Sequence, residues 1–441
     1  MTRATAQERA ADTQARGTRR TVLTAGFVGN VVEWYDFALY GFFASTFSSI
    51  FFPEGDGAAH LIAVYGIFAA GFVMRPIGSV LFGWLGDVAG RSRTMMISVA
   101  LMALPTFALA VLPGHEAIGI WAAVGLVAIR LLQGLSVGGE FSTSVVYLVE
   151  TARRDRRGLS GSMANLGSVA GTALGSLAAM AVLNLLPAAA AETWGWRVPY
   201  VLGGLIGIGA LWLRRRLPTS PAFEAQEASR EESAPIRDTL RRHPRLTAQA
   251  TLFAAGYGVF FYLALVYFPN WVDRHGALGL DHAMRLNTAA LIAILPVVAL
   301  GGWLSDRQAL TRRALVASAL IAGGLATGPS LWLATLGPWA AGAAQLTLAV
   351  LIGVMLGAGP ALFAELFPAA SRNTGYSISF ALGMGIGGGA TPMMATWAIE
   401  VTGWSYAPAA LMALAALAGA GAALAMPIRD RAALQSTGAI A

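Results

Sequence analysis

The sequence contains no cysteine and no lysine. Without cysteine there is no disulfide framework, thiol nucleophile or thiolate metal site, and the sequence does not indicate a redox compartment. Charge is also scarce, because charged residues make up 12% of the 441 residues, whereas a soluble chain carries roughly 25%. Together with 56% hydrophobic residues and a mean hydropathy of +0.61, this composition excludes most soluble enzymes and basic nucleic-acid-binding proteins.

The motifs of nucleotide, metal and hydrolase sites are missing as well. There is no phosphate-binding loop, Gly-x-Ser-x-Gly elbow, dinucleotide fingerprint after a strand or two-histidine metal spacing. None of the five histidines falls in the interior of a long apolar run, which disfavours a histidine proton relay. We therefore expect neither an enzyme nor a protein with a metal or organic cofactor, and no nucleic-acid partner.

Long apolar runs are what the chain does have. A helix that crosses about 30 Å of hydrocarbon needs about 20 mostly apolar residues. Twelve such runs occur, separated by short polar segments, and they predict twelve membrane spans. They lie near 21–50, 60–84, 94–112, 118–149, 159–186, 198–213, 247–271, 286–304, 314–336, 340–365, 374–399 and 405–427.

Arginine is concentrated on one side of these predicted spans. If the N-terminus is cytoplasmic, 25 of the 30 arginines fall in inner segments, and the outer segments are acidic. Residues 1–20 are polar and lack an apolar core, which indicates a cytoplasmic arm rather than a secretory signal. We expect a multi-pass protein of the cell (inner or plasma) membrane with both termini in the cytoplasm. The net charge of +7 then reflects the arginines that set the orientation of the chain in the membrane.

One long hydrophilic segment, residues 214–246, divides the spans into an N-terminal half, residues 21–213, and a C-terminal half, residues 247–427. A short tail, 428–441, follows. Gly83-Trp84-Leu85, Asp87 and Arg93 recur 219 positions later as Gly302-Trp303-Leu304, Asp306 and Arg312. This duplication predicts an all-α membrane protein with twelve transmembrane helices in two pseudo-symmetric six-helix bundles, which is a transporter architecture.

A second repeat lies at the inner ends of spans in both halves. Glu150 and Arg157 are seven residues apart, and so are Glu365 and Arg372. This second repeat supports the duplication.

Ionisable residues within hydrocarbon are costly and therefore functional candidates by default. In the first span, Asn30, Glu33 and Tyr40 share one helical face, and Asp36 follows Glu33 by three residues. The simpler interpretation is a hydrogen-bonded patch between helices. Two carboxylates are more than packing requires, however, so we keep both interpretations.

The fourth span carries a polar stripe that includes Arg130, Gln133 and Glu140. Arg130 and Glu140 are separated by about 15 Å along a helix, which is too far for direct pairing. Arg75 of the second span is the obvious partner for a carboxylate. The alternative is a static buried ion pair that only orients helices.

These groups suggest a division of roles. A carboxylate in a low-dielectric cavity can take up a proton in the operating range, which makes Glu140, Glu33 and Asp36 the available proton carriers. Guanidinium stays charged and can bind a carboxylate through two hydrogen bonds, which makes Arg75 and Arg130 the available anion-binding groups.

Several motifs resemble those of a known family. The inner loop GWLGDVAGRSR, residues 83–93, resembles the signature loop of the major facilitator superfamily, and RLLQG, residues 130–134, resembles its fourth-span motif. Four further stretches resemble the metabolite:proton symporter family, which transports α-ketoglutarate, citrate, dicarboxylates, shikimate or proline/betaine. They are residues 29–37, 74–78, 133–140 and 194–199.

This resemblance implies proton-driven uptake by alternating access, with a substrate site between the halves near the bilayer midplane. It also implies that Asp87, Arg91 and Arg93 form an inner gate. Glu150 is the expected partner of these arginines. In the second copy Leu310 replaces the counterpart of Arg91, which predicts a weaker C-terminal gate. Asp87 acting only as a helix cap is the alternative.

The substrate expected from the two intramembrane arginines is a small organic anion, such as α-ketoglutarate, another dicarboxylate or citrate. Arg75 and Arg130 would hold its carboxylate, with further contacts from Tyr40, Asn30, Gln133, Tyr257 and Tyr262. The coupling ion would be H⁺, carried or gated by Glu140 with Glu33 or Asp36. Gating residues would be Asp87, Arg91, Arg93, Glu150, Arg157, Asp306, Arg312, Glu365 and Arg372.

Two rival functions stay open. A zwitterionic osmolyte such as proline or glycine betaine would need an aromatic cage, to which Trp34, Tyr35, Tyr257 and Tyr262 could contribute. A membrane-embedded metabolite sensor would need a domain that relays the signal, and none is evident. We expect a monomer whose partners are its substrate and the lipid bilayer.

Overall fold

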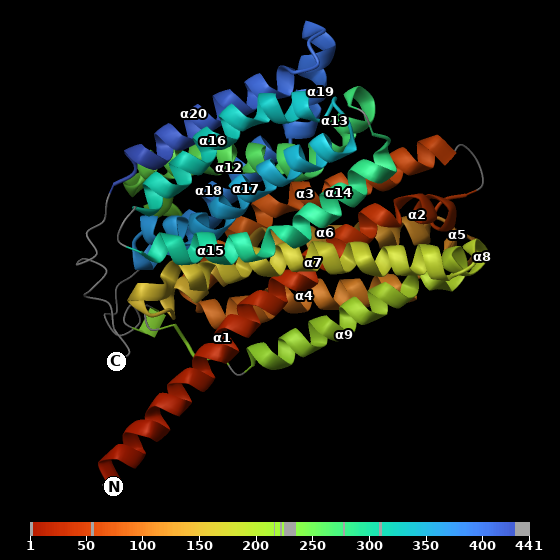
Figure 1. Ribbon diagram of the computed structural model, residues 1–441. Helices are drawn as coiled ribbons and strands as arrows, with labels where there is room; N and C mark the ends of the chain where they lie inside the picture. The colour runs from red at the N-terminus through yellow and green to blue at the C-terminus, as the bar shows by residue number, and fades with distance from the viewer. Residues whose placement is uncertain are drawn as a thin grey trace.

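Long helices running side by side make up the chain (Figure 1). The computed structural model describes residues 3–53, 57–215, 217–220, 223–224, 235–276, 278–307 and 311–427, and within these ranges there is no strand. The predicted all-α membrane fold is confirmed. The tail 428–441, Leu310 and much of the hydrophilic segment 214–246 lie outside the described residues.

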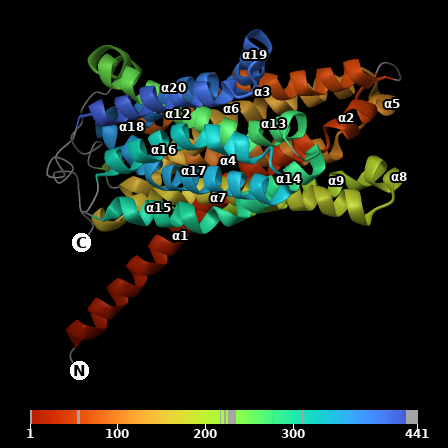
Figure 2. The same ribbon diagram turned by 45° about the horizontal axis from the view of Figure 1, so that its top comes forward.

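The N-terminal half contains six long helices and several short ones. The long helices are α1 (Arg3–Phe42), α3 (Gly57–Val88), α4 (Arg91–Val111), α6 (Trp121–Glu150), α7 (Arg157–Leu185) and α9 (Arg197–Arg214). The short ones are α2 (Ala44–Ile50), α5 (His115–Ile118), η1 (Arg154–Arg156), α8 (Ala188–Ala190) and η2 (Ala191–Gly195). The predicted arm 1–20 is the start of α1 from Arg3 onward, and this part projects away from the other helices (Figures 1 and 2).

The C-terminal half follows two short elements, α11 (Pro235–Arg237) and η3 (Asp238–Arg242). Three of its spans are each built from consecutive elements. The first consists of α12 (Pro244–Tyr262), η4 (Leu263–Tyr267) and α13 (Phe268–His275), and the second of α14 (Leu280–Ala293) and α15 (Leu295–Asp306). The third consists of α18 (Arg372–Phe380), η6 (Ala381–Gly388) and α19 (Thr391–Thr402). The others are α16 (Arg312–Leu333), α17 (Pro338–Leu366) and α20 (Ala407–Ala425), with the short η5 (Ala369–Ser371) before α18.

In the described part of the chain, nine helices are long and apolar enough to cross a membrane. The other three predicted spans coincide with α1, with α3 and with the α18–η6–α19 segment. The twelve predicted runs therefore all correspond to helices.

Glycine permits the close approach of α1 and α7. Gly167, Gly171 and Gly175 are spaced by four residues on α7, and a Cβ atom at each would collide with the α1 backbone at Phe27, Val31 or Tyr35. Small residues at this spacing let membrane helices pack backbone against backbone.

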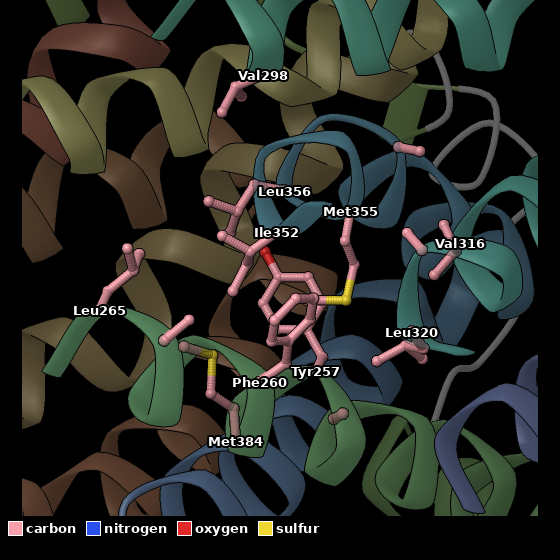
Figure 3. Close-up of a cluster of buried hydrophobic side chains, with 14 of the residues drawn as sticks. Tyr257, Phe260, Leu265, Val298, Val316, Leu320, Ile352, Met355, Leu356 and Met384 are labelled. Carbon is pink, nitrogen blue, oxygen red and sulfur yellow. The ribbon is translucent and has the colours of Figure 1, made fainter. Parts of the chain in front are cut away.

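An apolar cluster fills the C-terminal half between α12, α16 and α17 (Figure 3). Tyr257 and Phe260 of α12 project among Ile352, Met355 and Leu356 of α17. Because all of these side chains except the Tyr257 hydroxyl are apolar, this part of the half is a rigid packed core and not a binding cavity.

The α1–α7 contact predicts the effect of one substitution. Gly171→Leu inserts a side chain where the Val31 backbone leaves no space, so the purified protein should melt several degrees lower, as overpacking by about 1–3 kcal/mol implies. The matched control is Gly209→Leu on α9, where a Cβ meets nothing within 4 Å. Equal melting temperatures for the two variants would contradict this account of the contact.

Candidate functional site between the two halves

Four buried charges of the N-terminal half form two separate ion pairs. In the first, Asp36 of α1 accepts a hydrogen bond from Arg130 of α6 at 2.7 Å. Its other carboxylate oxygen accepts from Thr106 and Gln133, each at 3.0 Å. The Arg130 guanidinium lies over the Tyr40 ring, 3.7 Å from its centroid. Arg130 and Gln133 are therefore engaged inside the half.

In the second pair, Glu140 of α6 binds both terminal nitrogens of Arg214, one of them at 2.8 Å. Ser98 of α4 donates to the same carboxylate, and Arg214 also donates to the Met95 carbonyl at 2.5 Å. The expectation that Arg75 pairs with a carboxylate of the polar stripe is wrong for Glu140. The partner is Arg214, which the sequence placed at the edge of the hydrophilic segment but which is fully buried.

Gly29 provides the space for this second pair. A Cβ atom at Gly29 would overlap the Arg214 guanidinium and lie 2.7 Å from Glu140 Oε1. The pair thus joins α4, α6 and α9 and packs against α1, one helical turn from Glu33.

Glu33 and Arg75 lie where the halves meet. The Arg75 guanidinium stacks on Phe37 of α1 at 4.7 Å and hydrogen-bonds to Tyr262 of α12, in the other half. Glu33 is buried, lies within electrostatic range of Arg75, and its Oε2 atom has no hydrogen-bond partner.

Aromatic rings from both halves complete this site. Trp34 lies between Phe37 and Phe261 of α12, with ring centroids 6.3 and 5.8 Å away. Its indole nitrogen is buried and has no partner. The space between α1, α3 and α12 thus brings together an acidic and a basic side chain, aromatic rings, and buried polar atoms without hydrogen-bond partners. This is the arrangement of a candidate small-molecule site.

The remaining predicted substrate contacts lie away from Arg75. Asn30 donates to the Gly26 carbonyl and to Ser144, and the Tyr40 hydroxyl donates to the Val64 carbonyl, all within the N-terminal half. Tyr257 accepts a hydrogen bond from Asn165 of α7 at 3.0 Å, which links the halves, but its ring belongs to the apolar cluster of Figure 3. Tyr35 donates to the Pro199 carbonyl.

The halves interlock at the end of the bundle that carries the Arg-rich loops, here called the Arg-rich end. Asp87, at the end of α3, accepts hydrogen bonds from the backbone nitrogens of Asn373 and Thr374 at 3.2 and 2.9 Å. It therefore caps the N-terminus of α18, where a carboxylate satisfies free N–H groups and opposes the helix dipole. Asp87 thus acts as a helix cap, the alternative considered for it, but the capped helix belongs to the other half.

The same interlock recurs with the halves exchanged. Asp306, at the end of α15, accepts from the backbone nitrogens of Gly158 and Leu159 at 2.7 and 2.9 Å and so caps α7. The sequence repeat of Asp87 and Asp306 thus corresponds to a structural repeat.

Ion pairs surround both caps. Arg91 pairs with Asp87 at 3.1 Å and with Glu150 at 3.3 Å, and Glu150 crosses to Arg372 at 2.8 Å. In the second copy Arg312 pairs with both Asp306 and Glu365, and Glu365 crosses to Arg157 at 3.7 Å.

Arg93 and its counterpart Arg312 behave differently. Arg93 is exposed and takes no part in the described interlock, so its expected pairing is not found. Arg312 occupies the place that Arg91 has in the first copy. Leu310 lies outside the described residues, so the weaker gate expected from it stays a prediction. Arg312 binds two carboxylates, as Arg91 does.

Outside these charges, no group of three or more His, Asp or Glu residues in the described ranges is arranged to hold a metal ion. What the geometry provides is a polar site between two helical halves and an ion-paired closure at one end. These two features are those of a secondary transporter.

The comparisons with known proteins identify the family. The sequence profile of the Major Facilitator Superfamily matches residues 26–379, and the chain belongs to this superfamily. It is 34% identical over 387 residues to the alpha-ketoglutarate permease of Escherichia coli K12, covering 86% of this chain and 87% of the permease. It is therefore a membrane transporter and not an enzyme.

Other relatives differ in what their names say they carry. The citrate-proton symporter of Klebsiella pneumoniae is 33% identical, with 92% of each chain covered. The glycine betaine/proline/ectoine/pipecolic acid transporter OusA of Dickeya dadantii is 31% identical, with 91% of this chain and 82% of OusA covered. The fold matches the proton:xylose symporter XylE bound to 6-bromo-6-deoxy-D-glucose, with a TM-score of 0.74, 18% identity and coverage of 91% and 95%.

The Glu140–Arg214 pair predicts a stability effect. Glu140→Gln leaves a buried guanidinium without its counter-ion, which should lower the free energy of unfolding by about 3–5 kcal/mol. Glu140→Gln/Arg214→Gln should recover part of this loss, as a double-mutant cycle in thermal or denaturant unfolding will measure. Asp155→Asn, which breaks an exposed pair with Arg153, is the control and should cost at most about 1 kcal/mol. A stable single variant would contradict the pairing.

The interlock predicts a change of conformation. Asp306→Asn weakens the cap on α7, so the Arg-rich end should open more often. Since the chain has no cysteine, spin labels on Arg93→Cys and Arg245→Cys report this distance directly. We expect a longer distance distribution in Asp306→Asn than in the parent, with Asp155→Asn as the control; identical distributions would show that the cap does not hold the halves together.

Proposed function

We propose that the protein takes up a small organic anion, such as α-ketoglutarate, another dicarboxylate or citrate, together with protons, in the cell inner membrane with both termini cytoplasmic. The observation that carries the proposal is the position of Arg75: its guanidinium lies at the junction of the halves, over Phe37 of α1 and against Tyr262 of α12. A guanidinium binds a carboxylate through two parallel hydrogen bonds. A site between the halves is also the one that alternating access exposes to each side in turn.

Glu33 is the carboxylate that best fits the role of proton carrier. Asp36 and Glu140, the other two candidates, are each held by a guanidinium at 2.8 Å or less. Glu33 interacts electrostatically with Arg75, and a substrate bound at Arg75 would interact with the same guanidinium. An anion bound at Arg75 would repel a charged Glu33, so substrate binding favours its protonated form, and this mutual dependence couples the two.

The names of the relatives support a carboxylate ligand without choosing among substrates. Alpha-ketoglutarate, citrate, proline and glycine betaine all carry a carboxylate. For the zwitterionic alternative, Trp34, Phe261 and Tyr262 are neighbouring aromatic rings, and Tyr262 contacts Arg75. The ammonium group of a substrate held at Arg75 would contact these rings. Tyr35 and Tyr257, which the sequence also suggested for such a cage, are engaged elsewhere.

The experiment is substrate-evoked pH change in proteoliposomes, with α-ketoglutarate, citrate, succinate, glycine betaine and proline as the panel. We expect alkalinisation of the outer medium with one or more of the three carboxylic acids. A signal with betaine or proline and none with these acids would establish the zwitterionic alternative. A chain that binds these compounds without moving them would be a sensor.

Two variants separate substrate binding from proton coupling. Arg75→Ala should reduce uptake at least a hundredfold, the scale of one lost charge-assisted contact of about 3 kcal/mol. Glu33→Gln should retain substrate exchange across the membrane but lose accumulation driven by a pH gradient. Arg93→Ala, at an exposed position, is the control. Uptake by Arg75→Ala at the parental rate would remove Arg75 from the site.

A further inference from the structure

An apolar groove runs along the outer face of α3 near the Arg-rich end. Ile77, Val80, Leu81 and Trp84 follow one another at helical spacing, and all four are substantially exposed. Pro76 and, from outside the half, Ile236 of α11 complete the lining of this groove, which encloses about 610 Å³. The extra wall from α11 makes the surface concave, unlike the convex face that a single helix presents to lipid.

The element that supplies this wall is amphipathic. Ile236 and Leu240 are four residues apart on α11–η3, and Leu240 is exposed. Thr239 faces inward, fully buried, and its carbonyl accepts a hydrogen bond from Thr247 of α12 at 3.0 Å. Arg237 and Arg241, also four apart, are exposed beside the apolar pair. A helix of this kind lies in the membrane interface, with its apolar side chains toward the acyl region and its arginines at headgroup level.

The charge next to the groove is predominantly positive. Arg242 and Arg245 are exposed as well, so four arginines occur within nine residues, against the single acidic residue Asp238. An apolar groove beside a basic cluster at the cytoplasmic boundary is complementary to a lipid with an anionic headgroup. A zwitterionic lipid would fill the groove but would bring no net negative charge to this cluster.

We propose that the α3–α11 groove, lined by Pro76, Ile77, Val80, Leu81, Trp84 and Ile236, binds an anionic phospholipid. One acyl chain lies along α3, and Arg237 and Arg241 bind the headgroup phosphate. The occupant bridges α3, near its end at Val88, and the segment that connects the two halves. Binding therefore stabilises this segment against the N-terminal half.

The experiment uses the purified full-length chain in mixed micelles of phosphatidylglycerol and phosphatidylcholine, with the retained lipids counted by native mass spectrometry. We expect a preference for phosphatidylglycerol on the order of tenfold, because each arginine near the surface contributes several-fold to anionic-lipid binding. Arg237→Gln/Arg241→Gln should abolish this preference. Val80→Trp, which fills the groove from an exposed position, should reduce retention of both lipids.

The matched control is Arg153→Gln/Arg156→Gln, which removes two exposed arginines at the same end of the bundle, away from the groove. It should keep the parental preference. An equal loss in both double variants would reduce the effect to general surface charge and overturn the proposal. The proposal would also be overturned if Val80→Trp left lipid retention unchanged, or if millimolar inorganic phosphate displaced the lipid. Either result would mean that the arginines bind an anion and that the groove does not hold an acyl chain. Melting temperatures of all variants verify that they are folded.

Discussion

A charge inside hydrocarbon must be neutralised locally, and the N-terminal half is built around this requirement. Glu140 and Arg214 are both almost inaccessible and bind each other through two hydrogen bonds. Such a pair is tolerated only where its remaining polar atoms find partners. Ser98 and the Met95 carbonyl provide them, and Gly29 leaves the space. The Glu140–Arg214 pair therefore connects α4, α6 and α9 and packs against α1 at Gly29. Glu33 lies one helical turn along α1 from Gly29.

Charged groups are also paired at the Arg-rich end, where they hold the two halves together. Each half ends a helix with an aspartate that caps a helix of the other half, and each cap is surrounded by an arginine and a glutamate. Hydrogen bonds from helix N-termini and ion pairs at a water boundary are individually modest. Their contributions can be lost one after another as the halves separate, so the closure is firm but reversible, as a transport cycle needs.

The site between the halves brings polar groups of both halves together. Glu33 and Trp34 keep polar atoms without partners, and Arg75 reaches from α3 to Tyr262 across the junction. Unsatisfied buried polar atoms are costly unless a ligand completes them. Under the proposed function, a substrate bound at Arg75 would complete the hydrogen bonds of Glu33 and Trp34.

The helical spans could be predicted from the sequence, because the length of an apolar run is a local property. The five intramembrane charges could be predicted for the same reason. The internal repeats indicated Asp87, Asp306, Glu150 and Glu365, which lie in the interlock, but also Arg93, which takes no part in it. Which charge pairs with which could not be predicted. Arg214 and Arg215 are neighbours in the sequence, and only the rotation of α9 against Gly29 and Glu140 decides that Arg214 is buried and Arg215 exposed. Arg312 takes the place of Arg91 although the repeat aligns it with Arg93. Hydropathy and repeats determine where helices run, whereas ion pairing depends on distances of a few ångströms between helices far apart in the chain, and only the tertiary structure sets those distances.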